Sequence, residues 1–244
     1  MLKFDHIILA VSDLAAASRD FEAAGFTVSP GGVHSAGTTH NALVLLPDGA
    51  YLELIARTGA PTPEGSTDLT FLLEHGEGPV GFCLFSDDLD ADTEKIRMRG
   101  AHVSAPLDGG RVRPDGVWMQ WRIAWVEEMQ LPFVIQDVTP RERRVPDDDL
   151  TALTHMNGAR GLHGVNMRVG SASTMARLHA VFGEPIEAGA RSVTFDCAGG
   201  IVRAELTGIA DMIESIALAG ISAPFTVRST RFVPVSSASA QARS

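Results

Sequence analysis

The spacing of apolar residues alternates along the chain between two patterns, which predicts a mixture of strands and helices. Residues 6–11 form an almost continuous apolar run, as in a buried strand. After Asp13, a good helix N-cap, apolar residues recur between Leu14 and Phe21 at the spacing of one helix face. Gly25 is expected to end this helix, because glycine adopts a left-handed conformation without steric cost.

Further strands complete this first unit. Residues 26–28 continue after the helix, and the apolar runs 41–46 and 51–56 flank a turn that contains Asp48 and Gly49. An Asp-Gly pair between two apolar runs is a strong hairpin signal. The first unit is therefore predicted to be a strand, a helix and three strands.

The same order returns later in the chain, which indicates an internal repeat. Residues 81–89 match residues 6–14, since an apolar strand again runs into polar residues that cap a helix. Gly100 is expected to end this second helix, and apolar runs follow at 117–126 and 133–136. The repeat predicts that two such units pair with each other.

A third, looser copy begins near Gly164. We expect its helix at about 173–182, strands around 193–195 and 201–206, and the start of a fourth strand set at 212–219. The predicted organisation is a domain at 1–140 made of units 1–58 and 79–139, a third, degenerate unit at 150–235 and a flexible tail at 236–244.

The composition is that of a globular protein and argues against some partners. The 244 residues are 45% hydrophobic and carry a formal net charge of -10, which disfavours binding to nucleic acid or to an anionic membrane. No apolar run approaches the ~20 residues of a membrane span, and residues 2–6 lead into a strand pattern without a signal peptide. Cys83 and Cys197 lie in apolar runs and are expected to be reduced thiols of a cytoplasmic protein.

Two polar residues interrupt the apolar strands of the first unit. His6 lies in the first strand and Glu53 in the last, and burying either costs free energy unless it has a partner. An imidazole and a carboxylate on neighbouring strands are good ligands for a divalent metal, and the alternative is a hydrogen-bonded pair without metal. Because catalytic metals usually have three protein ligands, His40 and His34 are candidates for the third.

The second unit carries a polar stripe on one of its strands. Alternation over residues 118–125 places Trp118, Gln120 and Arg122 on one face and the larger apolar residues on the other. We expect the apolar face to pack under the helices and the polar face to line a cavity. Arg122 would then either bind an anionic group of a ligand or neutralise Glu53 across the cavity.

Several short segments of both units together are similar to one known family. They are Phe4-Asp5-His6, Gly31-Gly32-Val33-His34, residues 37–43, Tyr51-Leu52-Glu53-Leu54-Ile55, Arg113-Pro114-Asp115-Gly116, Trp121-Arg122 and residues 131–136. With these segments the chain resembles the vicinal-oxygen-chelate superfamily and, within it, the glyoxalase-like domain group. The resemblance implies an α+β fold in which paired βαβββ units form a cup-shaped mixed sheet. It also implies a metal at the base of the cup, held by the first and last strands of both units, that polarises two adjacent substrate oxygens.

Carried over residue by residue, the resemblance makes His6 and Glu53 the metal ligands of the first unit. The second unit has Gly81 at the place of His6 and no carboxylate at 133–136, so His40, or the weaker ligand Gln136, is expected to be the third ligand. The implied ion is divalent, such as Zn, Ni, Mn or Fe. The candidate residues are Glu53 and His40 for catalysis, His6, Glu53 and His40 for the metal, and Trp118, Gln120 and Arg122 for substrate binding.

Two functions follow from this pattern. The first is a metal-dependent lyase, isomerase or dioxygenase that acts on a small oxygenated molecule. The alternative is a metal-free protein that binds or sequesters a small molecule, as resistance proteins do. The third unit is expected to cover an edge of the first sheet or to form a homodimer contact, with His163 and Glu205 on a solvated strand face.

Overall fold

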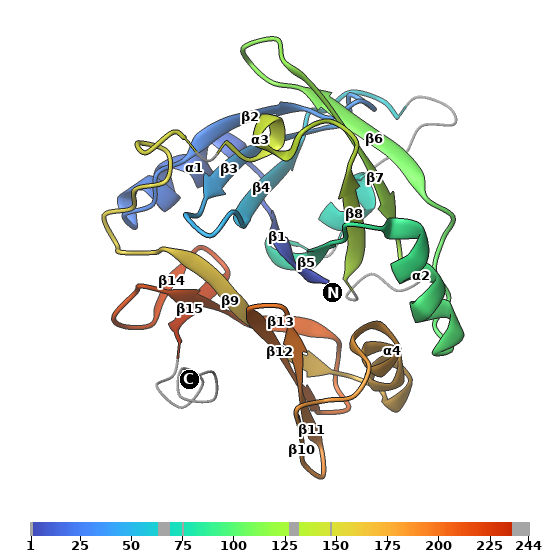
Figure 1. Ribbon diagram of the computed structural model, residues 1–244. Coiled ribbons are helices and arrows are strands. Elements are labelled where there is room, and N and C mark those ends of the chain that lie inside the picture. Colours follow the sequence, from blue (N-terminus) through green and yellow to red (C-terminus); the bar gives the residue numbers. More distant parts are fainter. Residues whose placement is uncertain (1, 63–68, 75, 127–131, 147, 236–244) are drawn as a thin grey trace.

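Two curved mixed sheets packed on each other make up the protein in the computed structural model (Figure 1). The structure describes residues 2–62, 69–74, 76–126, 132–146 and 148–235, so the predicted tail at 236–244 lies outside the described residues. The strand order of the first sheet is β2-β3-β4-β1-β5-β8-β7-β6, and that of the second is β10-β11-β12-β9-β13-β15-β14. The α+β fold with paired units in one cup-shaped sheet is confirmed.

Each half of the first sheet is one strand-helix-three-strand unit. The first unit consists of β1 (Lys3–Ala10), α1 (Leu14–Ala23), β2 (Ser29–Val33), β3 (Thr39–Leu45) and β4 (Tyr51–Arg57). The second consists of β5 (Gly78–Phe85), α2 (Leu89–Met98), β6 (Leu107–Val112), β7 (Trp118–Ala124) and β8 (Phe133–Asp137). A 3-10 turn, η1 (Thr70–Leu73), precedes the second unit, and the short helix α3 (Arg141–Arg144) follows it.

The second sheet repeats the strand order of the first with one edge strand fewer. Its first half consists of β9 (Gly161–Val169), α4 (Ala172–Phe182), β10 (Glu187–Ala188), β11 (Ser192–Cys197) and β12 (Gly200–Leu206). Its other half consists of β13 (Met212–Ala219), β14 (Phe225–Val227) and β15 (Thr230–Pro234). The strands β13, β15 and β14 take the places of β5, β8 and β7, so the run at 212–219 begins a fourth unit, in which no described helix follows the first strand.

The helices begin where polar residues cap them. Asp13 and Asp88 accept hydrogen bonds from the backbone N–H groups of Ala16 and Ala91 at 2.9 and 3.0 Å, which satisfies one of the free donors at each helix start. Ser171 caps α4 in the same way. Each capped helix packs one apolar face against a sheet.

The two edges of the first sheet meet, so that the sheet is nearly closed. Strand β2 reaches β6 through a bridge between His34 and Arg111, and the N–H of Ser35 donates to the carbonyl oxygen of Gly110 at 3.2 Å. Gly32 makes this approach feasible, because a Cβ there would lie 2.6 Å from the carbonyl oxygen of Val112. The seam between β2 and β6 closes the cup on one side.

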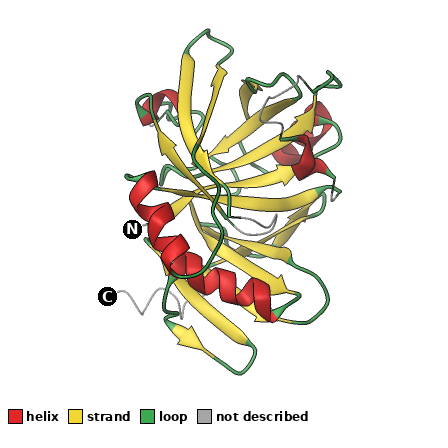
Figure 2. Ribbon diagram, turned by 90° about the vertical axis from the view of Figure 1, so that its right-hand side faces the viewer, coloured by secondary structure: helices red, strands yellow, loops and turns green. Residues whose placement is uncertain are grey.

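The convex face of the first sheet packs on the helices and on the second sheet in one shared core. Phe21 and Phe26 of the first unit contact Phe232 of β15, with ring centroids 6.1 and 5.4 Å apart. Helix α2 lies beside α4, where the Arg99 guanidinium donates to backbone carbonyls of α4 (Figure 1, Figure 2). No helix among the described residues combines the length and the apolar character that crossing a membrane requires.

The linker between the two sheets is tied to the first unit by His155. The backbone N–H of Thr27 donates to Nδ1 of His155 at 3.0 Å, so the proton of the ring is on Nε2, which donates to the carbonyl oxygen of Leu45 at 2.8 Å. Burial lowers the pKa of His155, which is consistent with a neutral ring. This histidine therefore has a structural role.

Candidate functional site

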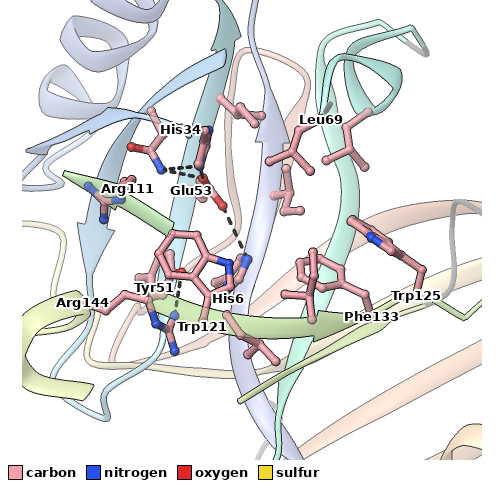
Figure 3. Close-up of a pocket in the computed structure, with 16 residues that line it drawn as sticks. His6, His34, Tyr51, Glu53, Leu69, Arg111, Trp121, Trp125, Phe133 and Arg144 are labelled. Carbon is pink, nitrogen blue, oxygen red and sulfur yellow. Dashed lines mark hydrogen bonds and ion pairs between the residues drawn. The ribbon is translucent and has the colours of Figure 1, made fainter. Parts of the chain in front are cut away.

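A cavity opens on the concave face of the first sheet, and its two ends differ in character (Figure 3). The first unit supplies a polar end around His6, His34 and Glu53, while the second supplies an apolar end around Trp125 and Phe133. The remaining lining residues are Ile8, Asn41, Tyr51, Ile55, Leu69, Leu72, Arg111, Trp121, Ile123, Ile135 and Arg144.

Strand register brings the two predicted polar residues to the same face. The strands β1 and β4 are parallel, with His6 opposite Tyr51 and Ile8 opposite Glu53. Side chains of paired residues point to the same side of a sheet, so His6 and Glu53 both face the cavity. Their closest atoms are Nε2 of His6 and Oε2 of Glu53, 3.5 Å apart.

Asp5 fixes the orientation and the tautomer of His6. Nδ1 of His6 lies 2.6 Å from Oδ1 of Asp5, and the Asp5 carboxyl is fully buried. Burial alone would raise the pKa of Asp5, but the charge and hydrogen bonds of Arg144, with the contact to His6, hold it well below its usual value. Because an ionised carboxylate only accepts, Nδ1 of His6 carries a proton, and in the neutral ring Nε2 then presents a lone pair to the cavity.

The short helix α3 supplies the cations that keep Asp5 ionised. Arg144 donates to both oxygens of Asp5 at 2.7 and 2.9 Å and to the hydroxyl of Tyr51 at 2.9 Å, and Arg141 donates to Asp5 at 2.6 Å. Asp137 accepts from both arginines, which completes a network of two carboxylates and two guanidinium groups. In the sequence, the charged run at 141–149 is the one local sign of this network, because its partners are far away in the chain.

Glu53 is buried among three hydrogen-bonding or charged partners. Nδ2 of Asn41 donates to Oε1 of Glu53 at 2.6 Å, and Nε2 of His34 lies 3.3 Å from the same oxygen. Burial alone would raise the pKa of Glu53, but the hydrogen bond and charge of His34, the charge of His6 and the Asn41 bond lower it to about 2. Glu53 is therefore a carboxylate at neutral pH, with one imidazole nitrogen facing each of its oxygens.

The second histidine at this end of the cavity is His34 and not His40. His34 lies just past the end of β2, where its Nδ1 contacts Oγ1 of Thr39 at 2.9 Å. On β3, Asn41 lines the cavity, and strand alternation places its neighbour His40 on the opposite face. The expectation that His40 is the third ligand beside Glu53 is therefore wrong by one position in the strand alternation. His34, the other histidine that the sequence offered as a third ligand, lines the cavity instead.

The faces of β7 are the reverse of those predicted. Trp121, Ile123 and Trp125 line the cavity, whereas Arg122 lies on the outer face and pairs with Asp90 of α2 at 3.0 Å. Apolar side chains can pack on either side of this strand, toward the helices or toward the cavity. Here the indole rings of Trp121 and Trp125 lie on the cavity side. Gln120 shares the outer face with Arg122, and Trp118 is 46% exposed, so none of the three predicted substrate-binding residues lines the cavity.

The last strand of the second unit likewise turns its polar residue outward. Phe133 and Ile135 line the cavity, while Nε2 of Gln136 points outward and donates to the carbonyl oxygen of Asp87 at 2.8 Å. Gln136 is therefore not brought near His6. Glu127 and Glu128, the acidic residues of the preceding turn, lie outside the described residues.

Two glycines, Gly31 and Gly109, lie in strands β2 and β6 beside the cavity. A Cβ on Gly31 would lie 1.9 Å from Oδ1 of Asn41, and a Cβ on Gly109 would lie 2.3 Å from Nε1 of Trp121. The absence of a side chain at each position makes room for a residue that lines the cavity. Local turn preferences do not reveal such a close approach.

Two sets of donors can be compared as metal ligands, and among the described residues only the first has all its ligand atoms within 4.8 Å of one another. Asp5, His6 and Cys83 offer ligand atoms within 4.8 Å of one another. However, Asp5 is bound by two arginines, and burial raises the pKa of the Cys83 thiol well above its usual value, so both disfavour a metal there. His6, His34 and Glu53 fit better, because Nε2 of His6 and Nε2 of His34 lie 3.5 and 3.3 Å from the two oxygens of Glu53 and all three residues line the cavity.

The candidate residues of the third unit lie apart from this cavity. Glu205 is exposed on β12, opposite Ser192 of β11, in an open hollow of the second sheet that also contains Arg203 and Arg231. Its surroundings match the expected solvated strand face. His163 lies on β9 in the same sheet.

The fold and the cavity define this protein as a member of the vicinal-oxygen-chelate superfamily. The chain belongs to the glyoxalase-like domain family, which it matches over residues 4–182. No curated protein matches the chain.

Two solved structures show the same fold, and a third overlaps 57% of the chain at a lower TM-score. A hypothetical protein from Staphylococcus aureus has a TM-score of 0.77 at 20% identity, covering 96% of this chain and 100% of that protein. A mutant of 4-hydroxymandelate synthase from Streptomyces coelicolor has a TM-score of 0.57 at 16% identity, covering 90% and 71%. Methylmalonyl-CoA epimerase from Streptomyces coelicolor has a TM-score of 0.41 at 26% identity, covering 57% and 100%.

Proposed function

We propose that the protein is a metal-dependent enzyme that converts a small oxygenated molecule by isomerase, lyase or dioxygenase chemistry. The observation that carries this proposal is the convergence of two imidazoles on one carboxylate. Nε2 of His6 and Nε2 of His34 lie 3.5 and 3.3 Å from different oxygens of Glu53. Two histidines and one carboxylate suit Zn or Fe(II) and leave coordination positions open for substrate.

Each residue around this set has a role that fits the proposal. The bound ion would act as a Lewis acid on substrate oxygens. Asp5 holds His6 with Nε2 toward the cavity, and Asn41 holds Glu53 through its bond to Oε1. The apolar wall around Trp125 and Phe133 would take the apolar part of the substrate and exclude water.

Metal analysis of protein purified without an affinity tag tests the proposal directly. After removal of metals with a chelator, the protein is offered Zn, Mn, Ni or Fe(II), and bound metal is measured by elemental analysis. We expect about one ion per chain. His34→Ala and Glu53→Ala should reduce metal uptake to trace levels, because each removes one of three ligands.

His40→Ala is the matched control, since it removes a histidine of the adjacent strand that does not line the cavity. Its metal content should equal that of the unchanged protein. The proposal fails if the unchanged protein takes up none of the four metals. The ligand set is wrong if His40→Ala abolishes uptake and His34→Ala does not.

A metal-free binding protein is the second candidate function. The observation that favours it is that Glu53 already has partners in Asn41, His34 and His6, so its charge is satisfied without an ion. Under this hypothesis the apolar wall supplies most of the binding energy. Protein that holds no metal but binds an apolar molecule, with quenching of the Trp121 and Trp125 fluorescence, would support it.

A further inference from the structure

Arg111 is a buried cation that forms no ion pair in the part of the chain that the structure describes. It lies on β6, is only 4% exposed and lines the polar end of the cavity (Figure 3). Within the described residues, its guanidinium has no hydrogen bond and no ion pair, in contrast to the buried Arg144, which pairs with Asp5 and Asp137. A guanidinium has five N–H donors, so Arg111 can donate several hydrogen bonds to a ligand in the cavity.

Such a position destabilises the empty protein. Burial lowers the pKa of Arg111, while the nearby Tyr51 and Glu53 oppose that effect. Arginine nevertheless stays charged, because its pKa in water is above 12. A buried, unpaired charge is costly to a fold, and proteins retain such groups mainly where a ligand provides the missing partner.

The charges around the cavity indicate the sign of that ligand. Arg141 and Arg144 are balanced by Asp5 and Asp137. What remains is the negative charge of Glu53 and the positive charge of Arg111. A divalent ion at Glu53 would therefore leave the lining with an excess of two positive charges, which favours an anionic substrate.

The fixed position of Arg111 relative to the proposed ligand His34 strengthens this argument. The two residues form the backbone bridge that joins β6 to the end of β2. The side chains on both sides of this bridge line the same cavity. A ligand that contacts Arg111 therefore lies at the polar end, beside the proposed metal ligands, with its remaining atoms directed toward the apolar wall.

That wall is suited to a flat or branched apolar body. Trp125 and Phe133 lie with ring centroids 4.4 Å apart, and Phe133 also contacts the ring of His6 at 5.6 Å. Trp121 and Leu72 also line the cavity. Aromatic surfaces of this kind favour rings through offset or edge-to-face contacts.

We infer that Arg111 is the anion-binding residue of the cavity, and that the substrate is a small carboxylate with an apolar, ring-sized substituent. The statement about substrate class rests on the proposed function, because it assigns the carboxylate to the enzyme that the metal set defines. Arg111 thereby takes the role that the sequence suggested for Arg122. Its planar fork matches the two oxygens of a carboxylate.

Two probes with the same skeleton test the inference. 3-Phenyllactate has a carboxylate next to a hydroxyl group, and 3-phenylpropane-1,2-diol has a neutral alcohol in place of the carboxylate. Binding of each is measured by calorimetry and by Trp121 and Trp125 fluorescence, with metal-free and metal-loaded protein. We expect 3-phenyllactate, called the lactate below, to bind at least tenfold more tightly than the diol. A hydrogen bond to a charged group changes a binding constant by about a factor of ten to a hundred.

Substitutions then assign the difference to Arg111. Arg111→Met keeps the aliphatic stem and removes the charge, so it should reduce lactate affinity at least tenfold and leave diol affinity unchanged. Arg111→Lys should restore part of the lactate affinity, because it keeps a point charge without the fork. Arg122→Met is the matched control on the outer face and should leave both affinities unchanged.

A stability measurement separates this role from a structural one. If Arg111 serves the ligand, Arg111→Met should melt at the same or a higher temperature than the unchanged protein, because it removes an unpaired buried charge. A melting temperature lowered by more than a few degrees would overturn the inference, as would equal binding of both probes or no binding of the lactate. Lactate binding that depends on Arg111 in a protein that takes up no metal would overturn the proposed metal site and keep the anion-binding role.

Discussion

Asp5 decides which nitrogen of His6 faces the cavity, and this makes the residue beside a candidate ligand as informative as the ligand. An acceptor at Nδ1 leaves Nε2 with its lone pair exposed to the site, which is the form a metal requires. The same reasoning connects Glu53 to Asn41, because the amide orients one carboxylate oxygen and leaves the other free. These neighbours act through the two residues that would contact a metal.

Glu53 should give the protein a distinct acid sensitivity. Its pKa is about 2 in the folded state and about 4.5 in an unfolded chain, so the folded state binds fewer protons between these values. The stabilisation is complete above pH ~4.5 and disappears as the pH falls toward 2. From this group we expect a loss of about 3 kcal/mol in the unfolding free energy of the metal-free protein.

Urea unfolding at a series of pH values measures this loss. Glu53→Gln cannot titrate and should show a shallower decline between pH 5 and 2 than the unchanged protein. Glu205→Gln, which removes an exposed carboxylate of the second sheet, should follow the unchanged protein. Identical slopes for all three proteins would contradict the assignment of a low pKa to Glu53.

Single functional residues can be identified from the sequence when they are polar and lie in an otherwise apolar strand. His6 and Glu53 stand out because each is polar in an apolar run. Arg111 and Arg144 do not, because their burial results from a sheet edge and a linker that close over them. Neither event is visible in local spacing.

Among the elements, the four-residue helix α3 has an influence out of proportion to its length. It places Arg141 and Arg144 one turn apart so that both reach Asp5, the residue that orients His6. It also receives the carboxylate of Asp137 at the end of β8. The linker after the second unit thus stabilises a residue at the centre of the first.

Arg144→Met should therefore destabilise the protein strongly. The substitution leaves the fully buried Asp5 with a single cation, and breaking a buried ion pair from one side costs about 3–5 kcal/mol. Arg143→Met is the matched control, because Arg143 is exposed on the same helix and should change the unfolding free energy by less than ~0.5 kcal/mol. Equal midpoints of urea unfolding for the two variants would refute a supporting role for α3.

Element type and order were predictable, whereas the orientation of strands was predictable only in part. Helix starts at Asp13 and Asp88 follow from side-chain capping, which is local chemistry. The faces of β7 were assigned in reverse, because both of its sides pack against something: Trp121 against the cavity and Arg122 against Asp90. Alternation tells which residues share a face, and a second sheet element is needed to tell which face points inward.

For the whole molecule, the joint core predicts that the two sheets unfold together. Phe232 is fully buried in β15 of the second sheet, yet its ring contacts Phe21 and Phe26 of the first unit. Phe232→Ala should cost about 3–5 kcal/mol. Trp118 and Trp121 lie on β7 of the first sheet, and Trp125 directly follows that strand. The fluorescence of all three tryptophans therefore monitors the first sheet.

Fluorescence and circular dichroism should consequently report one shared transition, shifted to lower denaturant in Phe232→Ala. Val233→Ala, whose side chain lies on the other face of β15, is the control and should shift the transition much less. A tryptophan transition that stays in place while the overall dichroism signal shifts would mean that the sheets unfold independently.

The repeat made the architecture of the first sheet predictable, because two copies of one unit have few ways to pair. The stacking of the second sheet was not predictable in this way. It depends on contacts such as Phe26 with Phe232, which join residues more than 200 positions apart. The open hollow of the second sheet further shows that a repeated backbone need not repeat a site.

The seam between β2 and β6 has a kinetic consequence for any occupant of the cavity. His34 and Arg111 face each other across this seam, one from each free edge of the sheet. A molecule that contacts both residues would link the two edges of the sheet. It would therefore oppose their separation. The two edges would then separate less often when a molecule is bound than when the cavity is empty.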